Sequence, residues 1–509
     1  MTAATLPSLV AELAARTPDA PALVAGERRL SFGELDEAAR RAATVLADAG
    51  ESVGLLAPNR ADWLVVALGA MRAGARVDAF NTWSKAWDLE HLLAASACRV
   101  LVTVERARST DTLGELRRLV PEVLDGGRSE RFPALERVIV LGEQWDGLLA
   151  TAGPTDADHS TPDDVAFVLY TSGSTSRPKA VPLCQGDMLA NGASIGDRMG
   201  LSAADRVWLG SPLFWSFGSA NALPATWTHG ACLVVQEHFA PAEAADLLAA
   251  ERCTAAYLLP TMVDALIPQA GRVRAVTSLR TGLTIGRPEE VERAVRELDV
   301  PELCNVYGST EVYGNCCVTP HDAPLELRLV SQGPPLDGVE VRAVDPDGRV
   351  LPTGEAGELQ VRGHVMPGYL GAPEATAAVM TADGWFRTGD RLLVRDDGYV
   401  EFGARLTDMI KTSGINVAPA EVESYLAGHP AVAEVAVVGA PHPSRGEVVI
   451  AFVTVTEGVD GETLQAWCRE GIAGYKVPFR VVVLPELPRT VTGKLTRSTL
   501  VELAVEEAR

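Results

Sequence analysis

The sequence lacks the patterns that mark most metal-binding, disulfide-rich and P-loop proteins. Its eight cysteines include no CxxC pair and no Cys/His spacing typical of a zinc site. Scattered cysteines favour a reduced chain over a disulfide framework, and the adjacent Cys316 and Cys317 are expected to pack in the core. The Walker sequence GxxxxGK followed by Ser or Thr is also absent. Any phosphate site must therefore be built in another way.

Basic charge and long apolar runs are scarce as well. The 45 Lys and Arg against 67 Asp and Glu give a formal net charge of −22, which repels nucleic acid and anionic membranes. The most apolar segment, WLVVALGAM, ends at Arg72 and is too short to span a bilayer. The first residues, MTAATLPSLVAELAART, show no basic stretch followed by an apolar run. We predict a soluble cytoplasmic protein with no nucleic-acid partner, no signal peptide and no membrane span.

Length and periodicity indicate more than one domain, since single cores rarely exceed about 250–300 residues. Over the first three hundred residues, helical segments such as RADWLVVALGAMRAG alternate with apolar strands such as VGLLAP and CTAAYLLP. This alternation is typical of βαβ units around a largely parallel sheet. From about residue 330, period-two alternation with Gly, Pro and Asp turns predicts antiparallel hairpins. The last ~100 residues predict a separate small α+β domain. For the chain as a whole, the alternating helices and strands of the larger part predict the α/β fold class.

The segment YTSGSTSRPK, residues 170–179, predicts an anion-binding loop. It follows the buried strand DDVAFVLY and precedes a helix predicted over residues 185–199. Glycine permits a tight turn that exposes backbone N–H groups, the hydroxyl residues add donors, and Lys179 adds a positive charge. Such a loop can hold polyphosphate oxygens. The plain alternative is a solvated Ser/Thr-rich loop.

The loop resembles the phosphate-binding signature of the adenylate-forming superfamily, which includes acyl-CoA synthetases, luciferases and the adenylation domains of peptide synthetases. Later motifs of that family follow in order: NVYGSTEVYG (305–314), WFRTGDRLLV (385–394), FGARLTDMIKTSGINVAPAEVE (402–423) and PRTVTGKLTR (488–497). The resemblance therefore covers nearly the whole chain. It implies a large N-terminal AMP-binding domain (1–403) of βαβαβ-type subdomains plus a small β-barrel. A small mobile C-terminal domain (404–509) would follow, with its hinge near residues 405–408.

The resemblance also implies a reaction and a set of site residues. A carboxylate would attack the α-phosphorus of Mg·ATP, and the resulting acyl-AMP would pass its acyl group to coenzyme A. Lys494 would bridge the carboxylate and the α-phosphate, Thr310 would bind the α-phosphate, and Glu311 would ligate Mg²⁺. Tyr307 would stack near adenine and Asp390 would bind the ribose hydroxyls. The full ATP-binding set is Thr171, Ser172, Gly173, Ser174, Thr175, Lys179, Asn305, Tyr307, Gly308, Ser309, Thr310, Asp390, Arg405 and Lys494.

Four positions in these motifs depart from the family pattern. Ser176 and Ala180 stand in the loop where glycine is usual. Ala404 also replaces glycine, and Thr407 occupies the position where the family's backbone pivots and where Asp or Lys is common. These residues bear on the mobility of the loop and on the energetics of the hinge.

The acyl pocket is expected along SPLFWSFGSANALP (211–224) and TGLTIG (281–286). The candidate pocket residues are Trp215, Ser216, Thr281, Gly282, Thr284, Tyr313 and Gly314. Ser216 stands where α-amino acid adenylation domains commonly carry Asp, which argues against an α-amino acid. We predict a short, cyclic or aromatic carboxylate as the small-molecule partner. Trp215, at a position where acyl-CoA synthetases often have His, is equally well explained as a core aromatic.

The expected acceptor is coenzyme A, with Gly414 leaving room for the thiol arm and Arg445 near a CoA phosphate. Other acceptors stay open: a carrier protein, an amine, or chemistry that activates nitrite toward an amine. An inactive homologue is disfavoured because Glu311, Asp390, Arg405 and Lys494 are all present. A homodimer is a further possibility.

Overall fold

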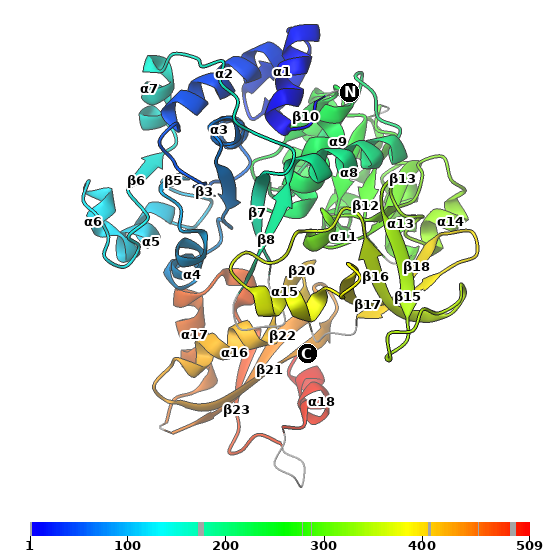
Figure 1. Cartoon of the computed structure of the whole chain (residues 1–509). Helices are drawn as coiled ribbons and strands as arrows, with labels where there is room; N and C mark the ends of the chain where they lie inside the picture. The colour runs from blue at the N-terminus through cyan, green and yellow to red at the C-terminus, as the bar shows by residue number, and fades with distance from the viewer. Residues whose placement is uncertain are drawn as a thin grey trace. The chain divides into compact units, whose positions relative to one another are not determined.

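The computed structural model describes residues 3–171, 178–276, 278–286, 288–405, 409–456, 458–488 and 495–508. The chain divides into two compact units. The first contains residues 1–82, 93–169 and 180–406, and the second contains residues 83–92, 170–179 and 407–509. Figure 1 labels the elements along the chain.

The first unit contains a six-stranded sheet in which successive neighbours β6, β5, β3, β4 and β7 run parallel. In spatial order the strands are β6 (Arg137–Val140), β5 (Val100–Thr103), β3 (Ser52–Leu56), β4 (Arg76–Ala79), β7 (Val165–Thr171) and β8 (Lys179–Cys184). Strand β3 and helix α3 (Ala61–Arg72) are buried along their whole length, as expected of a parallel sheet covered by helices. The other helices of the first unit are α1 (Leu6–Arg16), α2 (Phe32–Val45), α5 (Thr112–Leu119), α6 (Pro121–Leu124) and α7 (Glu143–Thr151), whereas α4 (Ala86–Ser96) belongs to the second unit over its residues 86–92.

A second, eight-stranded sheet of the first unit provides the framework for most of the expected site residues. Its spatial order is β14 (Cys317–Val318), β13 (Glu302–Tyr307), β12 (Thr281–Thr284), β11 (Ala255–Leu258), β9 (Arg206–Leu209), β10 (Cys232–Val235), β1 (Pro21–Ala25) and β2 (Arg28–Ser31). The inner strands are parallel, and β14 and β2 close the two edges as antiparallel strands. Because parallel strands end at the same edge, β12 and β13 deliver their C-terminal residues to one side of the sheet.

Helices cover this sheet and complete its core. They are α8 (Gln185–Arg198), α9 (Leu223–Thr228), α10 (Pro241–Ala250), α11 (Pro260–Leu266), α12 (Ala270–Arg274), α13 (Pro288–Glu297) and α14 (Leu325–Val330). Residues of α10, α11 and α13 pack with Trp208, Ala256 and Leu303 of the strands in one hydrophobic cluster. Strong burial on both strand faces is the signature that the apolar runs predicted.

The remaining part of the first unit is a four-stranded antiparallel sheet. Its strands are β15 (Glu340–Val344), β16 (Ala356–Arg362), β17 (Phe386–Val394) and β18 (Val400–Arg405), with α15 (Pro373–Val379) between β16 and β17. It occupies the stretch where the sequence predicted hairpins and a small barrel. Asp390 lies on β17, opposite Arg405 of β18 in the strand register.

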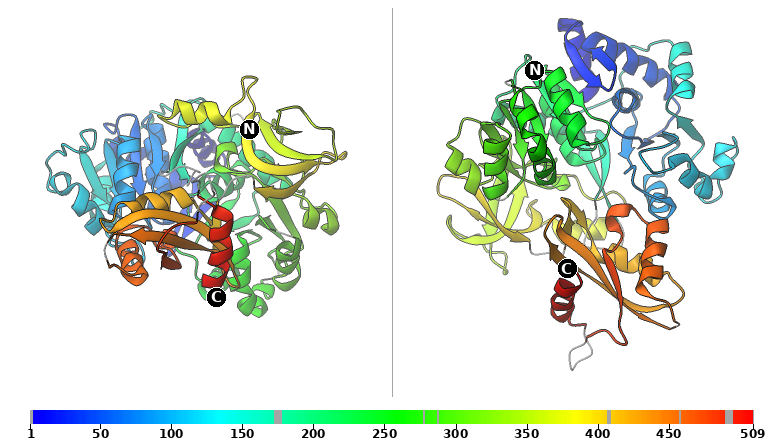
Figure 2. Two further views of the ribbon diagram at one scale, coloured as in Figure 1. Left: turned by 90° about the horizontal axis from the view of Figure 1, so that it is seen from below. Right: turned by 180° about the vertical axis from the view of Figure 1, so that it is seen from behind.

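The second unit is built on a five-stranded sheet with helices on both faces. Its strands are β20 (Ile415–Val417), β19 (Ile410–Thr412), β22 (Gly446–Val455), β21 (Val432–His442) and β23 (Arg480–Val483), and its helices are α16 (Pro419–Ala427), α17 (Gly461–Gly471) and α18 (Arg497–Glu507). One apolar cluster joins the sheet to α16 and α17, and a separate one joins it to Leu500 and Ala504 of α18. Figure 2 shows α18, coloured red, beside the sheet.

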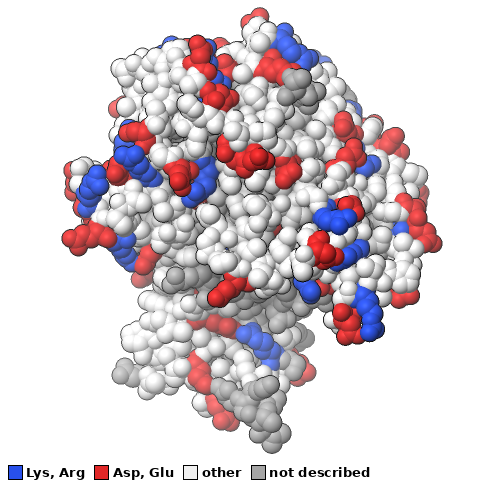
Figure 3. All heavy atoms as spheres, viewed as in Figure 1, with Lys and Arg blue, Asp and Glu red and all other residues white. Residues whose placement is uncertain are grey.

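The structure confirms the α/β class and the order of elements that the sequence predicted. The helix expected over residues 185–199 is α8, and Cys316 and Cys317 are buried as expected of core residues. Within the described ranges, no helix is long and apolar enough to cross a membrane. On the face shown in Figure 3, acidic and basic side chains are interspersed.

Candidate functional site

The turn after β13 holds several of the predicted nucleotide-binding residues close together. Strand β13 ends at Tyr307, and a 3₁₀ turn, η3, follows over Thr310–Val312. Tyr313 then adopts a left-handed conformation with φ 58°. A Cβ atom placed on Gly308 would lie 2.3 Å from the Gly314 carbonyl oxygen. The turn therefore closes on itself where only a hydrogen atom fits.

Replacing Gly308 by alanine is expected to distort this turn. The added methyl group cannot be accommodated without backbone movement, and overpacking of this kind costs about 1–3 kcal/mol. We expect Gly308→Ala to lower the unfolding temperature and the rate of pyrophosphate release. Gly271→Ala is the matched control, because no atom lies within 4 Å of its Cβ and alanine favours the helix α12. Equal unfolding temperatures for the two variants would contradict the tight closure.

Glu311 in this turn is held by a buried tyrosine from a distant part of the chain. Its Oε1 accepts a hydrogen bond from the Tyr369 hydroxyl at 2.9 Å, and its main-chain oxygen accepts one from Met366 N at 2.8 Å. Burial, reinforced by the nearby Glu311 charge, raises the pKa of Tyr369 well above its usual range. The phenol therefore stays protonated at neutral pH and donates to the carboxylate.

The donor set around Glu311 fits a magnesium ion that arrives with phosphate. In the described part of the chain, no group of three or more His, Cys, Asp or Glu residues is placed to hold a metal. Mg²⁺ needs hard oxygen ligands, and in nucleotide sites it commonly takes one or two carboxylates together with substrate phosphates and water. The single half-buried carboxylate of Glu311 suits that arrangement better than a resident metal centre.

Asp390 is held by a second buried tyrosine. The Tyr307 hydroxyl donates to Asp390 Oδ2 at 2.8 Å, and burial with the adjacent Asp390 charge raises the pKa of Tyr307 well above its ordinary value. The Tyr307 ring also stacks on Phe402, with centroids 6.2 Å apart and planes at 28°. Because Arg405 lies opposite Asp390 on the next strand, the fold brings the backbone of three predicted nucleotide-binding positions to one place.

The structure describes the two ends of the predicted phosphate loop but not its centre. Thr171 ends β7 and Lys179 begins β8. Ser172, Gly173, Ser174, Thr175, Ser176, Thr407 and Lys494 lie outside the described residues, and only the backbone of Ala404 and Arg405 is described. Asn305 is buried on β13 and its main-chain N–H donates to Thr319 Oγ1 at 2.8 Å. The buried hydroxyl of Ser309 has no hydrogen-bond partner in the described part of the chain, and Ala180 lies on β8.

The predicted acyl-pocket residues come from three elements of the first unit. Ser216 Oγ lies 3.2 Å from Thr310 Oγ1, which joins the segment after Trp215 to the turn. Thr281 on β12 directs its hydroxyl to the main-chain oxygens of Met199 and Glu302, at 3.0 and 3.1 Å. Gly282 and Thr284 are also on β12 and buried.

Tyr313 and Gly314 lie differently from one another. The Tyr313 hydroxyl accepts a hydrogen bond from Cys184 N at 3.0 Å, so its ring is turned toward the start of α8. Gly314 lies beside the main chain of Ser216, since a Cβ atom placed on it would be 3.4 Å from the Ser216 main-chain oxygen. Among these residues the hydroxyls of Thr281 and Tyr313 are thus engaged within the fold, and Ser216 and Gly314 stand beside Thr310.

Gly414 lies in the second unit, at the tip of the β19–β20 hairpin. Ser413 and Gly414 both have positive φ, 50° and 82°, as a two-residue hairpin of type I′ requires. Ser413 N donates to Arg445 O at 2.8 Å, which ties the hairpin to Arg445. Glycine at this tip is therefore explained by the turn itself.

Comparison with known proteins decides the family. The profile of the AMP-binding enzymes matches residues 10–370, and that of their C-terminal domain matches residues 421–494. The chain belongs to the AMP-binding enzyme family. Feruloyl-CoA synthase of Amycolatopsis sp is 35% identical over 94% of this chain and 95% of its own.

Solved structures of AMP-binding enzymes share the fold. The o-succinylbenzoate CoA synthetase of Bacillus subtilis, bound with a product analogue, superposes with a TM-score of 0.84 at 27% identity and covers 98% of both chains. The amide bond synthetase McbA of Marinactinospora thermotolerans has the same TM-score of 0.84 at 28% identity, covering 97% of this chain and 99% of its own. Relatives of this fold thus include both thioester-forming and amide-forming enzymes by name.

Two tyrosines of this AMP-binding enzyme were not predicted from the sequence. Tyr369 is 58 positions from Glu311, and no local spacing connects them. Tyr257 lies on β11 and donates to Asn221 at 2.8 Å, a contact across 36 positions. An apolar strand containing a tyrosine indicates only that the hydroxyl needs a partner.

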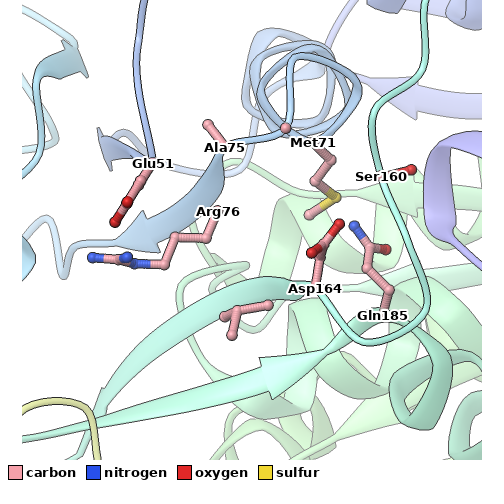
Figure 4. Close-up of a pocket in the computed structure, with 9 residues that line it drawn as sticks. Glu51, Met71, Ala75, Arg76, Ser160, Asp164 and Gln185 are labelled. Carbon is pink, nitrogen blue, oxygen red and sulfur yellow. The ribbon is translucent and has the colours of Figure 1, made fainter.

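One crevice of the first unit is lined by none of the predicted site residues. It measures about 190 Å³ and is lined by Glu51, Met71, Gly74, Ala75, Arg76, Ser160, Asp164, Val165 and Gln185 (Figure 4). Its polar groups serve the fold: Gln185 Oε1 accepts from Leu6 N, Asp164 accepts from Thr161 N, and Arg76 pairs with Asp78. We assign it no function.

Proposed function

We propose that this AMP-binding enzyme is an AMP-forming carboxylate–CoA ligase. Its relatives include feruloyl-CoA synthase, and the o-succinylbenzoate CoA synthetase shares its fold along the chain. The observation that carries the proposal is the pair of tyrosine-held carboxylates, Glu311 with Tyr369 and Asp390 with Tyr307, on neighbouring elements of one unit. Two carboxylates in these positions suit the metal and the ribose of Mg·ATP.

In the first half-reaction, an oxygen of the substrate carboxylate attacks the α-phosphorus of ATP and the bond to pyrophosphate breaks. Glu311 would hold Mg²⁺, which neutralises charge on the phosphates when bound. Tyr369 keeps the Glu311 carboxylate oriented, and Asp390 would accept hydrogen bonds from the ribose hydroxyls. Lys494 is proposed to neutralise the charge that develops on the α-phosphate. Binding and orientation account for the catalysis, so no covalent enzyme intermediate is required.

In the second half-reaction, the thiol of coenzyme A attacks the acyl carbonyl and AMP leaves. The second unit offers a crevice of about 80 Å³ for part of this ligand, lined by Thr412, Ser413, Arg445, Val448, Val449, Gly474, Tyr475, Val477 and Phe479. Arg445 lies over the Phe479 ring, 5.8 Å from its centroid. A guanidinium there supports a phosphate-bearing acceptor. Four expectations from the sequence stay predictions. They are the division into domains 1–403 and 404–509, the hinge between them, a homodimer and a cytoplasmic location.

An amine is the second candidate acceptor. The amide bond synthetase is as similar in fold as the CoA synthetase, with a TM-score of 0.84 for each. Both acceptors consume the same acyl-AMP, so the first half-reaction is common to the two candidates. The acceptor must therefore be identified from the product of the second step.

The test is pyrophosphate release from Mg·ATP over a panel of aromatic, cyclic and short aliphatic acids plus nitrite. Each is run alone, with coenzyme A and with an arylamine, and products are identified by mass spectrometry. Acid-dependent release with a CoA thioester supports the ligase. Release with an amide, or with nitrite and an amine, overturns the CoA assignment in favour of the amine or nitrite chemistry. If no acid and no nitrite gives pyrophosphate release under any of these conditions, the proposal is overturned.

A Lys494→Ala variant tests the assigned catalytic lysine. Loss of a charge aimed at the transition state costs about 10²–10³ in rate, so we expect that decrease in pyrophosphate release. Thioester formation from a synthetic acyl-AMP is expected to change only slightly, since that step follows pyrophosphate loss. The control is Arg480→Ala, which removes an exposed cation paired with Glu507. Full pyrophosphate release by Lys494→Ala would contradict the assignment.

A further inference from the structure

Asn221 carries a buried amide nitrogen that has no hydrogen-bond partner among the residues that the structure describes. It lies in the π-helical segment η1 (Phe217–Ala222), where Leu223 N donates to Gly218 O across five residues. Its Oδ1 accepts a hydrogen bond from the Tyr257 hydroxyl at 2.8 Å, whereas no described residue accepts a hydrogen bond from Nδ2. Buried polar groups are nearly always paired, and π-helical turns occur frequently at functional sites. The amide therefore needs a partner from outside the described chain.

Tyr257 sets the orientation of this amide. It lies on β11 and is fully buried, with Phe217 packed edge-on at 4.9 Å and 67°. Burial raises the pKa of Tyr257 well above its ordinary value, so the hydroxyl keeps its proton and donates to Asn221 Oδ1. With Oδ1 held there, Nδ2 is directed to the other side of the amide as a fixed donor.

The donor faces the turn that holds Thr310. A Cβ atom placed on Gly314 would lie 3.2 Å from Asn221 Nδ2 and 3.4 Å from the main-chain oxygen of Ser216. Ser216 Oγ in turn lies 3.2 Å from Thr310 Oγ1. Residues five apart in a π-helical turn lie one turn from each other, so Asn221 is one turn along from Ser216. The amide donor and the Ser216 main chain thus lie beside Gly314, and the Ser216 hydroxyl connects that segment to Thr310.

We propose that Asn221 Nδ2 selects carboxylic acids that carry an oxygen acceptor, such as an ether or a carbonyl, remote from the carboxylate. The inference rests on the proposed function, because it takes the reacting carboxylate to lie beside Thr310. A hydrocarbon acyl group would leave the amide donor unpaired, whereas an acceptor would pair it. Sites that hydrogen-bond a substrate group reject the analogue lacking it far more strongly than apolar pockets discriminate by size.

The experiment compares acids of nearly equal shape that differ in one acceptor. The first pair is 4-methoxycinnamate against 4-ethylcinnamate, and the second is 4-oxopentanoate against 4-methylpentanoate. For the full-length protein with Mg·ATP, kcat/KM for pyrophosphate release is expected to be at least about 10-fold higher for the acceptor-bearing member of a pair. Equal values within both pairs would overturn the proposal, and water would then be the partner of Nδ2.

Variants assign the preference to the amide itself. Asn221→Leu is expected to bring the ratio of kcat/KM within a pair close to one. Asn221→Asp replaces the donor by an acceptor and is expected to favour 4-aminocinnamate over 4-methoxycinnamate. Tyr257→Phe keeps the amide but frees its orientation, so an intermediate ratio is expected. Ser219→Ala, in the same segment, removes only a hydroxyl bonded to Trp215 O and should leave the ratio unchanged.

Failure of this inference is separable from failure of the proposed function. If pyrophosphate is released but Asn221→Leu keeps the wild-type ratio while its circular dichroism is native, the donor role is wrong. If no acid gives pyrophosphate, the ligase proposal fails, and calorimetric titration with the same pairs then tests recognition alone. Tighter binding of the acceptor-bearing acid, lost in Asn221→Leu, would still support the donor. Equal binding would overturn it.

Discussion

Replacing Glu311 by glutamine is expected to lower kcat/KM for Mg·ATP in pyrophosphate release about 100-fold. Glutamine preserves the shape and can still accept the Tyr369 hydrogen bond, but it removes the negative charge that a hard cation requires. A 100-fold loss corresponds to about 2.7 kcal/mol of transition-state stabilisation. The measurement is a titration of the rate with Mg²⁺ at fixed ATP, in which the variant should also need a higher Mg²⁺ concentration for half-maximal rate.

Tyr369→Phe is the matched variant for the same contact. It leaves the Glu311 carboxylate intact and removes only the hydroxyl that donates a hydrogen bond to it. The variant therefore tests the loss of a group that orients a metal ligand. Such losses typically cost about 10–100-fold in metal affinity, so the Mg²⁺ dependence should shift while the limiting rate at saturating Mg²⁺ falls little. A normal Mg²⁺ dependence in both variants would show that Glu311 is not a ligand. A defect in Tyr369→Phe larger than in Glu311→Gln would place the function on the tyrosine.

Much of the fold could be predicted because its signals are local. The apolar runs that became β3 and β11 are short and continuous, and the helix at α8 begins directly after its strand. The turn at Gly308 also has a local signal, since a glycine between a strand and a Thr-Glu pair marks a change of direction. Such features depend on residues a few positions apart, which periodicity and turn chemistry report well.

The groups that orient the site could not be predicted in this way. Tyr369 meets Glu311 across 58 positions, and Tyr307 meets Asp390 across 83. The first pairing joins a loop residue to the turn η3 and the second joins strands of two different sheets, β13 and β17, and no spacing in the sequence encodes either contact. Thr281 was expected at a pocket wall, but its hydroxyl donates to main-chain oxygens. The sequence did not indicate these partners either. Motifs therefore identify which residues matter better than they indicate which partners hold them.

Lys476 was also outside what the sequence indicated, since a lysine is rarely buried. In the second unit its Nζ lies 2.6 Å from Asp88 Oδ1 and 2.5 Å from Glu421 Oε1, and all three side chains are buried. Asp88 Oδ2 also accepts a hydrogen bond from Ala473 N at 3.1 Å. This lysine therefore joins segments that are far apart in the chain, since Lys476 and Asp88 are separated by 388 positions.

Lys476→Met is expected to destabilise the second unit by about 3–5 kcal/mol, because two carboxylates would stay buried without a cation. Since the chain has two units, a single unfolding free energy is not defined for the whole. Hydrogen exchange of peptides from α17 and β23, followed by mass spectrometry, reports the opening of this unit. The control is the triple variant Asp88→Asn, Glu421→Gln and Lys476→Met, which removes every charge of the cluster. Its exchange should return most of the way to that of the unmodified protein.

The deficit in Lys476→Met is expected to shrink as the pH is lowered. Burial raises the pKa of Glu421, opposed by the Lys476 charge, so the folded protein binds the Glu421 proton more tightly than the unfolded chain does. The stability that this proton provides is fully present below the unfolded pKa and is lost as pH rises through the folded pKa. Without Lys476 the opposing charge is gone and the folded pKa rises further. Exchange in Lys476→Met should thus approach that of the unmodified protein near pH 5 and diverge toward pH 8.

The Glu421→Gln, Lys476→Met double variant should lose most of this pH dependence. A deficit in Lys476→Met that is independent of pH would show that Glu421 does not carry the proton.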